Sequence, residues 1–278
     1  MSDDISHAPQ SSSCEFDAYI FDLDGTIYLS DTLLPTSLAT IAELRERGKR
    51  VLFLSNNPTR SRQEYAEKLT SLGIPTTHRD IINSSWVMTR YLQREVPAAR
   101  VFVVGEDSLC RELVQGGICL SEEADEIDVV VASFDRSFSY RKLQIAFDAV
   151  RRGARIFATN SDAYCPVPGG GLPDAAAVIA AIEACTKRQV EVVVGKPSRH
   201  MIEAVLDAAG IPAERCIMIG DRIETDIAMG HDAGMATALT LTGVTDRSMA
   251  TAAEIRPTFI ISNLAELLSL PLDGDRAR

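Results

Sequence analysis

Short apolar segments alternate with helical stretches along most of this chain, and this alternation constrains the fold more than any other feature. The predicted strands are Tyr19–Leu23, Arg50–Leu54, Val101–Val104, Asp128–Ala132, Arg155–Ala158, Val192–Val194, Cys216–Ile219, Thr237–Leu241 and Thr258–Ile261. The predicted helices are Leu38–Arg47, Arg62–Leu72, Ser84–Arg94, Ser108–Gln115, Tyr140–Arg152, Ala175–Thr186, Arg199–Ala209 and Glu224–Ala233. Strands that alternate with helices are typical of parallel sheets. The sequence therefore predicts an α/β fold with a Rossmann-like parallel sheet core flanked by helices.

Two carboxylates, Asp22 and Asp24, stand at the end of the first predicted strand. Side chains two residues apart on a strand point the same way, so both should project from one strand end. Like charges that close repel unless a cation or a shared proton relieves them. Gly25 permits a sharp turn directly afterwards. Taken alone, an Asp-x-Asp pair is more often a turn or a helix cap than a catalytic pair, so other residues must decide.

Polar clusters also follow three further predicted strands. They are Ser55-Asn56-Asn57, Gly195-Lys196-Pro197, and Gly220-Asp221-Arg222 with Asp226 further on. Ligands of open parallel sheets bind beyond the carboxyl ends of the strands, so these clusters should converge in space. Together they supply carboxylates, a hydroxyl, amides and one ammonium, a set that suits Mg²⁺ and a phosphoryl group.

The chemically suggestive residues lie before about Thr59 and after about Gly195, whereas the middle of the chain has its own strands and helices. A length of 278 residues is comfortable for two domains. We therefore expect a smaller α/β domain inserted between two halves of a core. The expected limits are a flexible N-terminal tail over 1–15, core over 16–86, the inserted domain over 87–187, core over 188–271 and a C-terminal tail over 272–278.

Charge and composition narrow the function classes. The formal charge of −11 argues against a nucleic-acid partner, which would require basic patches. No apolar stretch approaches the roughly 18 to 20 residues of a membrane span, and no signal peptide is recognisable. The six cysteines form neither a CxxC pair nor a disulfide framework, so we expect mostly buried, reduced thiols in a cytoplasmic protein.

Four motifs in order give the chain a family resemblance. Asp22–Thr26 (DLDGT), Ser55–Asn57 after VLFLS, Gly195-Lys196-Pro197 and Gly220–Asp226 resemble the four motifs of the haloacid dehalogenase superfamily. SNNPTRSR from Ser55, ATNSD from Ala158, VGKPS and GDRIETDI further resemble its nitrophenylphosphatase-like, or NagD-like, subfamily. That subfamily carries a large α/β cap, of the second type, between the second and third motifs, in agreement with the inserted domain.

The resemblance implies a Mg²⁺-dependent phosphatase for a small phosphorylated metabolite, and a role for each matching residue. Asp22 would be the nucleophile that forms an aspartyl-phosphate, and Asp24 the acid and base, oriented by Thr26. The expected phosphate-binding residues are Gly25, Thr26, Ser55, Asn56, Asn57 and Lys196. The expected metal ligands are Asp22, the backbone carbonyl of Asp24, Asp221, and Asp226 through water. Related proteins often pair through the cap, which makes a homodimer an expectation here.

Several alternatives stay open at this point. Asn160 and Asp162 end a predicted strand of the inserted domain and could either face the substrate or only pack. The run Pro168–Gly171 lacks a P-loop pattern and is expected to be a flexible loop reaching toward the site or, failing that, a surface turn. Besides a phosphatase, the motifs allow a phosphotransferase that uses the same intermediate with another acceptor. They also allow a catalytically silent phosphate-binding regulatory protein, although such a relative could lose any of the motif residues retained here.

Overall fold

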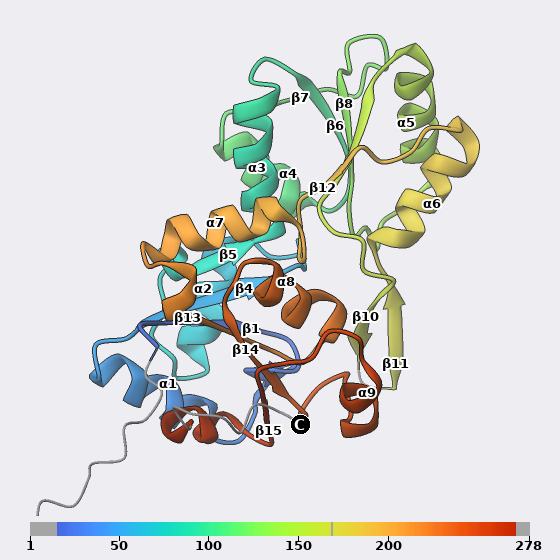
Figure 1. The fold of residues 1–278 in the computed structure, drawn as a ribbon. Helices are drawn as coiled ribbons and strands as arrows, with labels where there is room; N and C mark the ends of the chain where they lie inside the picture. The colour runs from blue at the N-terminus through green and yellow to red at the C-terminus, as the bar shows by residue number, and fades with distance from the viewer. Residues whose placement is uncertain (1–15, 168, 271–278) are drawn as a thin grey trace, which may run out of the picture.

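A six-stranded parallel sheet forms the larger layer of the molecule (Figure 1). The computed structural model describes residues 16–167 and 169–270, so the expected tails over 1–15 and 272–278 lie outside the described residues. In order across the sheet, the strands are β15 (Phe259–Ile261), β14 (Ala236–Thr240), β13 (Cys216–Gly220), β1 (Ala18–Asp22), β4 (Arg50–Ser55) and β5 (Ile81–Asn83). All neighbours pair in parallel, which confirms the predicted fold class.

Helices cover both faces of this sheet because its central strand is apolar on both sides. Ala18 and Ile20 of β1 belong to one hydrophobic cluster, and Tyr19 and Phe21 belong to another. The first cluster includes residues of α3 (Ser84–Glu95), α7 (Arg199–Ala209) and α8 (Ala228–Asp232). The second includes residues of α1 (Ser37–Glu46), α2 (Arg62–Ser71) and the 3₁₀ turn η4 (Leu264–Ser269). Continuous apolar strands of this kind are typical of parallel sheets covered on both faces.

A second, five-stranded parallel sheet stands beside the first in Figure 1. Its order is β12 (Val192–Val193), β9 (Arg155–Ala158), β8 (Val129–Ala132), β6 (Arg100–Val104) and β7 (Cys119–Leu120). The helices α5 (Tyr140–Arg152) and α6 (Ala175–Thr186) pack on one face of this sheet. The other face, with α4 (Asp107–Gln115) and α3, joins the first cluster of the six-stranded sheet. The two sheets therefore share part of one hydrophobic core.

The strand β12 joins the smaller sheet although its sequence lies in the expected core segment 188–271. Val192 pairs with Phe157 and Val193 with Ala158, both in β9. At the other end, the expected limit between residues 86 and 87 falls inside α3, which runs without a break. We therefore propose that the chain returns from the inserted domain after Val193, about six residues later than expected (193 − 187).

Two antiparallel hairpins add to the parallel sheets. The first joins β2 (Tyr28–Leu29) and β3 (Thr32–Leu33), and the second joins β10 (Tyr164–Val167) and β11 (Gly170–Pro173). The expectation of a flexible loop at Pro168–Gly171 is therefore wrong for its last two residues. Gly170 pairs with Val167 and Gly171 pairs with Pro166, so both glycines belong to β11.

Three details differ from the sequence prediction or extend it. The predicted helix Glu224–Ala233 is a π-helical turn, η3 (Ile223–Ile227), followed by the short α8. Among the five described cysteines only Cys216 is buried, so the expectation of mostly buried thiols is wrong, although all five are free. The elements that were not predicted are the strands β5 and β7, the helix α9 (Arg247–Ala252), the 3₁₀ turns η1 (His78–Asp80), η2 (Ala213–Arg215) and η4, and both hairpins. Within the described residues, no helix has the length and apolar character needed to cross a bilayer.

Candidate active site

The carboxyl ends of three adjacent strands bring the predicted motif residues together. β1 ends at Asp22, β4 ends at Ser55, and Asp221 directly follows β13. β1 lies between the other two strands, so Asp22 is flanked on both sides. This convergence is the one expected from strand-end positions alone.

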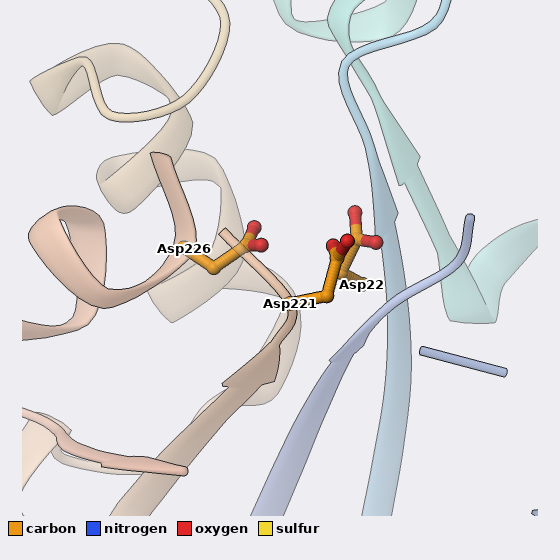
Figure 2. A group of neighbouring side chains, drawn as sticks. All are labelled: Asp22, Asp221 and Asp226. Atoms are coloured by element: carbon orange, nitrogen blue, oxygen red, sulfur yellow. The ribbon is translucent and has the colours of Figure 1, made fainter. Parts of the chain in front are cut away.

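Asp22, Asp221 and Asp226 form a compact carboxylate group (Figure 2). One oxygen from each lies within 4.8 Å of the others, and all three side chains are buried. Burial raises the pKa of Asp22 well above its ordinary value, against the opposing charge of Lys196. Burial, and then the charge of Asp226, raises the pKa of Asp221 to about 6. Such a group needs more positive charge to stay ionised, and clustered carboxylate oxygens are the donor set that Mg²⁺ prefers. The residues present therefore fit this ion.

Lys196 supplies the positive charge that the structure itself places among these carboxylates. Its Nζ lies 2.5 Å from Asp22 Oδ1 and 2.7 Å from Asp226 Oδ1. Burial lowers the pKa of Lys196, but the two carboxylates outweigh burial and hold the pKa above its ordinary value. The ammonium is therefore charged at neutral pH and lies beside the expected nucleophile.

Backbone donors and close-packed glycines fix Asp221 and Asp226. Asp221 Oδ2 accepts a 2.7 Å hydrogen bond from Val244 N, and Asp226 Oδ2 accepts one of 3.1 Å from Arg222 N. Gly25 has a φ of +90°, and a Cβ on it would lie 2.6 Å from Asp221 Oδ2. A side chain at Gly25 would therefore displace the Asp221 carboxylate.

Asp24 lines the same pocket as Asp22 but lies outside the compact carboxylate group. The chain turns after β1, where Gly25 N donates to Tyr28 O at 2.9 Å. Burial raises the pKa of Asp24, which favours its protonated form. The predicted link from Thr26 is not seen, because Thr26 Oγ1 is buried without a hydrogen-bond partner among the described residues.

The end of β4 and the loop after it carry Ser55, Asn56 and Asn57, which are hydrogen-bonded to residues of the core and of the inserted domain. Asn56 Oδ1 accepts from Lys196 N at 2.7 Å, and Asn56 Nδ2 donates to Asp162 Oδ2 at 3.1 Å. Ser55 Oγ accepts from Asn57 N at 3.1 Å and lies 3.2 Å from Tyr65 Oη. These bonds hold the loop in one conformation at the edge of the pocket.

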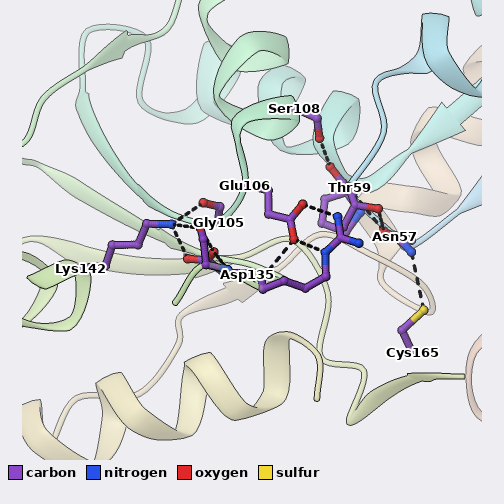
Figure 3. A network of polar contacts seen from close by, with 11 residues as sticks. Asn57, Thr59, Gly105, Glu106, Ser108, Asp135, Lys142 and Cys165 are labelled. Atoms are coloured by element: carbon purple, nitrogen blue, oxygen red, sulfur yellow. Dashed lines mark hydrogen bonds and ion pairs between the residues drawn. The ribbon is translucent and has the colours of Figure 1, made fainter. Parts of the chain in front are cut away.

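The inserted domain reaches this loop at two further points, both visible in Figure 3. Ser108 Oγ, at the start of α4, donates to Pro58 O at 2.6 Å. Asn57 Nδ2 lies 3.7 Å from Cys165 Sγ in the β10–β11 hairpin. Next to these contacts, Arg136 forms an ion pair with Glu106, and Lys142 forms one with the buried Asp135. The position of the inserted domain is thus linked directly to the loop expected to bind phosphate.

The two residues of the inserted domain named from sequence have different positions. Asp162 lines the pocket, whereas Asn160 is fully buried behind it. Asn160 Nδ2 donates to Asp162 Oδ2 at 3.1 Å and to Asp174 Oδ1 at 3.0 Å. Asn160 therefore positions two carboxylates and lies outside the residues that line the pocket.

Sequence reasoning missed part of the pocket lining. The additional lining residues are Tyr164, Cys165, Pro166, Asp174, Arg222 and Thr225. The only available signal was that Asp174 precedes the alanine-rich helix α6, which predicts an N-cap and no further role.

Comparison with known proteins gives the family. A model described as haloacid dehalogenase-like hydrolase matches residues 19–119, and one described as HAD-hydrolase-like matches residues 193–267. The chain is 38% identical to the sugar-phosphatase AraL of Bacillus subtilis over 92% of this chain and 93% of that protein. This chain belongs to the haloacid dehalogenase-like hydrolases. It is also 34% identical to chloroplastic phosphoglycolate phosphatase 1A of Arabidopsis thaliana, over 91% of this chain and 76% of that protein.

Solved structures confirm the subfamily resemblance. The 4-nitrophenylphosphatase of Thermotoga maritima superposes with a TM-score of 0.87 at 35% identity, covering 91% of this chain and 97% of that one. The four motifs read from the sequence therefore identified the family and the fold.

Proposed function

We propose that this protein is a Mg²⁺-dependent phosphatase that hydrolyses small phosphomonoesters through an aspartyl-phosphate on Asp22. The observation that carries the proposal is the buried group of Asp22, Lys196, Asp221 and Asp226, which forms where the neighbouring strands β1 and β13 end. Its relatives include proteins named as a sugar-phosphatase and a phosphoglycolate phosphatase, which supports hydrolysis of phosphomonoesters.

The two carboxylates of the first motif would divide the reaction between them. Asp22 would attack phosphorus, so that an Asp22 oxygen–phosphorus bond forms as the bond to the leaving oxygen breaks. Asp24 would give its proton to that leaving oxygen, and its raised pKa suits this step. Asp24 would then take a proton from the water that attacks phosphorus and releases Asp22. Ser55 and the loop amides would hold the phosphoryl oxygens, and Lys196 would neutralise charge on the nucleophile and the phosphate.

The metal would be held by Asp22, Asp221 and the backbone carbonyl of Asp24, with Asp226 further out. When bound, Mg²⁺ would reduce the repulsion between the Asp22 carboxylate and an incoming phosphate dianion. The domain around the five-stranded sheet would act as a cap that excludes bulk water. Pairing of two copies through this domain stays a prediction, which the molar mass in solution would test.

Asp22→Asn tests the mechanism with 4-nitrophenyl phosphate as substrate. We expect turnover to be abolished with the fold intact by circular dichroism, because the amide is a poor nucleophile. Asp148→Asn is the control, since Asp148 lies on α5 and its carboxylate contacts only Gln144 among the described side chains. Near-normal turnover by Asp22→Asn would contradict the mechanism.

Chelation tests the metal separately. Removal of divalent ions by EDTA should stop hydrolysis of 4-nitrophenyl phosphate, and added Mg²⁺ should restore it. Hydrolysis at the original rate by protein confirmed to be metal-free would contradict the metal assignment.

A further inference from the structure

The part of the pocket contributed by the inserted domain is rich in carboxylates. Asp162 and Asp174 line the pocket from that domain, and Arg222 and Thr225 line it from the core. The same cavity reaches Asp22. A phosphate held at Asp22 would therefore direct the rest of the substrate toward these side chains.

Asp174 is the more buried of the two carboxylates that line the pocket from the inserted domain. It is 3% exposed and caps α6 through Oδ1, which accepts from Ala175 N at 2.6 Å and from Asn160 Nδ2 at 3.0 Å. Both of these bonds end on Oδ1, so no hydrogen bond from a described residue reaches Oδ2, and the side chain lines the cavity. A serine or asparagine would cap the helix without burying a charge, so capping alone does not explain a carboxylate here. Burial raises the pKa of Asp174 to about 6, which leaves it ionised at neutral pH.

Asp162 is arranged in the same way. Its Oδ2 accepts from Asn56 Nδ2 and from Asn160 Nδ2, each at 3.1 Å, while no hydrogen bond from a described residue reaches Oδ1. Both carboxylates are thus oriented by amides and keep one acceptor oxygen for another donor.

Arg222 is the one cationic residue on this side of the described pocket, and its charge is largely opposed. Burial lowers the pKa of Arg222, but the Asp162, Asp221, Asp22 and Asp226 carboxylates outweigh burial and hold the pKa above its ordinary value. A carboxylate on the substrate would meet more negative than positive charge in this part of the cavity. A hydroxyl group would instead find acceptor oxygens that have no other donor.

We propose that Asp162 and Asp174 select phosphomonoesters whose leaving group is a neutral polyol and reject those whose leaving group carries a carboxylate. The inference rests on the proposed phosphatase function and deepens it by naming the substrate class. A site with acceptors in place discriminates in two ways, because the correct substrate pairs them and the wrong one adds like charge.

Glycerol 3-phosphate and 3-phosphoglycerate form a matched pair of probes, since they differ only in a terminal hydroxymethyl or carboxylate group. We expect the Mg²⁺-loaded enzyme to show a kcat/KM at least about tenfold higher for glycerol 3-phosphate. Asp174→Asn and Asp162→Asn each keep an acceptor oxygen but remove one charge, so each should reduce this ratio about threefold or more. Asp148→Asn removes one charge elsewhere in the same domain and should leave the ratio unchanged.

Each outcome decides the proposal. A kcat/KM for 3-phosphoglycerate equal to or above that for glycerol 3-phosphate would overturn the proposal. Ratios in Asp174→Asn and Asp162→Asn that match the ratio in Asp148→Asn would also overturn it. Calorimetric binding of both probes to the Asp22→Asn variant measures the preference without turnover. If the wild-type protein hydrolyses neither 4-nitrophenyl phosphate nor the probes, the proposed phosphatase function fails. The ratio of the two probes' affinities, measured by calorimetry, then still supports or overturns the proposed specificity.

Discussion

Lys196 Nζ lies 2.5 Å from Asp22 Oδ1, although 174 residues separate the two along the chain. The contact joins the strand end of β1 to the segment that returns from the inserted domain. One ammonium therefore holds together two carboxylates, Asp22 and Asp226, that would otherwise repel. Asp22 therefore lies beside a residue from which the whole inserted domain separates it in the sequence.

Lys196→Met should remove activity and weaken the fold. We expect kcat for 4-nitrophenyl phosphate to fall at least about a hundredfold, because the positive charge beside the nucleophile is lost. Loss of one partner from a buried ion pair should lower the free energy of unfolding by about 3–5 kcal/mol. Lys187→Met, at an exposed position, is the control for both measurements. A variant with near-normal kcat would remove Lys196 from the mechanism.

Gly25→Ala should disturb Asp221 as well as the turn. Gly25 and Gly48 have φ angles of +90° and +73°, so alanine is strained at both, but only at Gly25 does a Cβ meet the Asp221 carboxylate. We expect Gly48→Ala to cost about 1 kcal/mol and Gly25→Ala at least about 1 kcal/mol more. Denaturant unfolding measures both, and only Gly25→Ala should reduce turnover. Equal losses in the two variants would show that the contact with Asp221 is unimportant.

The convergence of Asp22, Ser55 and Asp221 could be predicted because it depends only on strand order and direction. The apolar segments were long and periodic enough to mark those strands, and parallel strands end at one edge of a sheet. Lys196 was identified by its motif, although only tertiary structure shows that it bridges Asp22 and Asp226.

Other features depend on contacts that the local sequence does not encode. β12 is a two-residue strand, and its place beside β9 follows from packing of the inserted domain. The β10–β11 hairpin contains Pro166 and two glycines, residues that argue against a strand. The π-helical turn at η3 directs Asp226 toward Lys196 and cannot be distinguished from an ordinary helix by apolar periodicity. Asp174 was missed because an N-cap and a pocket residue look alike in sequence.

Asp174→Asn should change how stability depends on pH. The pKa of Asp174 is about 6 in the folded protein, above the ordinary 3.8, because the side chain is buried. The folded state therefore binds this proton more tightly, and the stability contributed by Asp174 falls as pH rises from about 4 to about 6. Asparagine does not titrate, so the variant should gain up to about 3 kcal/mol relative to wild type between pH 4 and pH 8. Urea unfolding of wild type and Asp174→Asn at pH 4 and pH 8 measures this difference, with Asp148→Asn as the charge control. Parallel pH profiles of stability for wild type and Asp174→Asn would contradict the prediction.

Ser108→Ala should loosen the link between the inserted domain and the phosphate-binding loop. Ser108 Oγ is buried and donates to Pro58 O at 2.6 Å, three residues after Ser55 (58 − 55) (Figure 3). Alanine would leave that carbonyl without its donor, at a cost of about 1–3 kcal/mol in the free energy of unfolding. Because the same loop carries Ser55 and Asn56, kcat/KM for 4-nitrophenyl phosphate should fall about two- to tenfold. Ser71→Ala, which removes an exposed hydrogen bond to Lys68 O, should leave both quantities nearly unchanged. A loss of stability in Ser108→Ala with full activity would show that this bond stabilises the fold without positioning the loop.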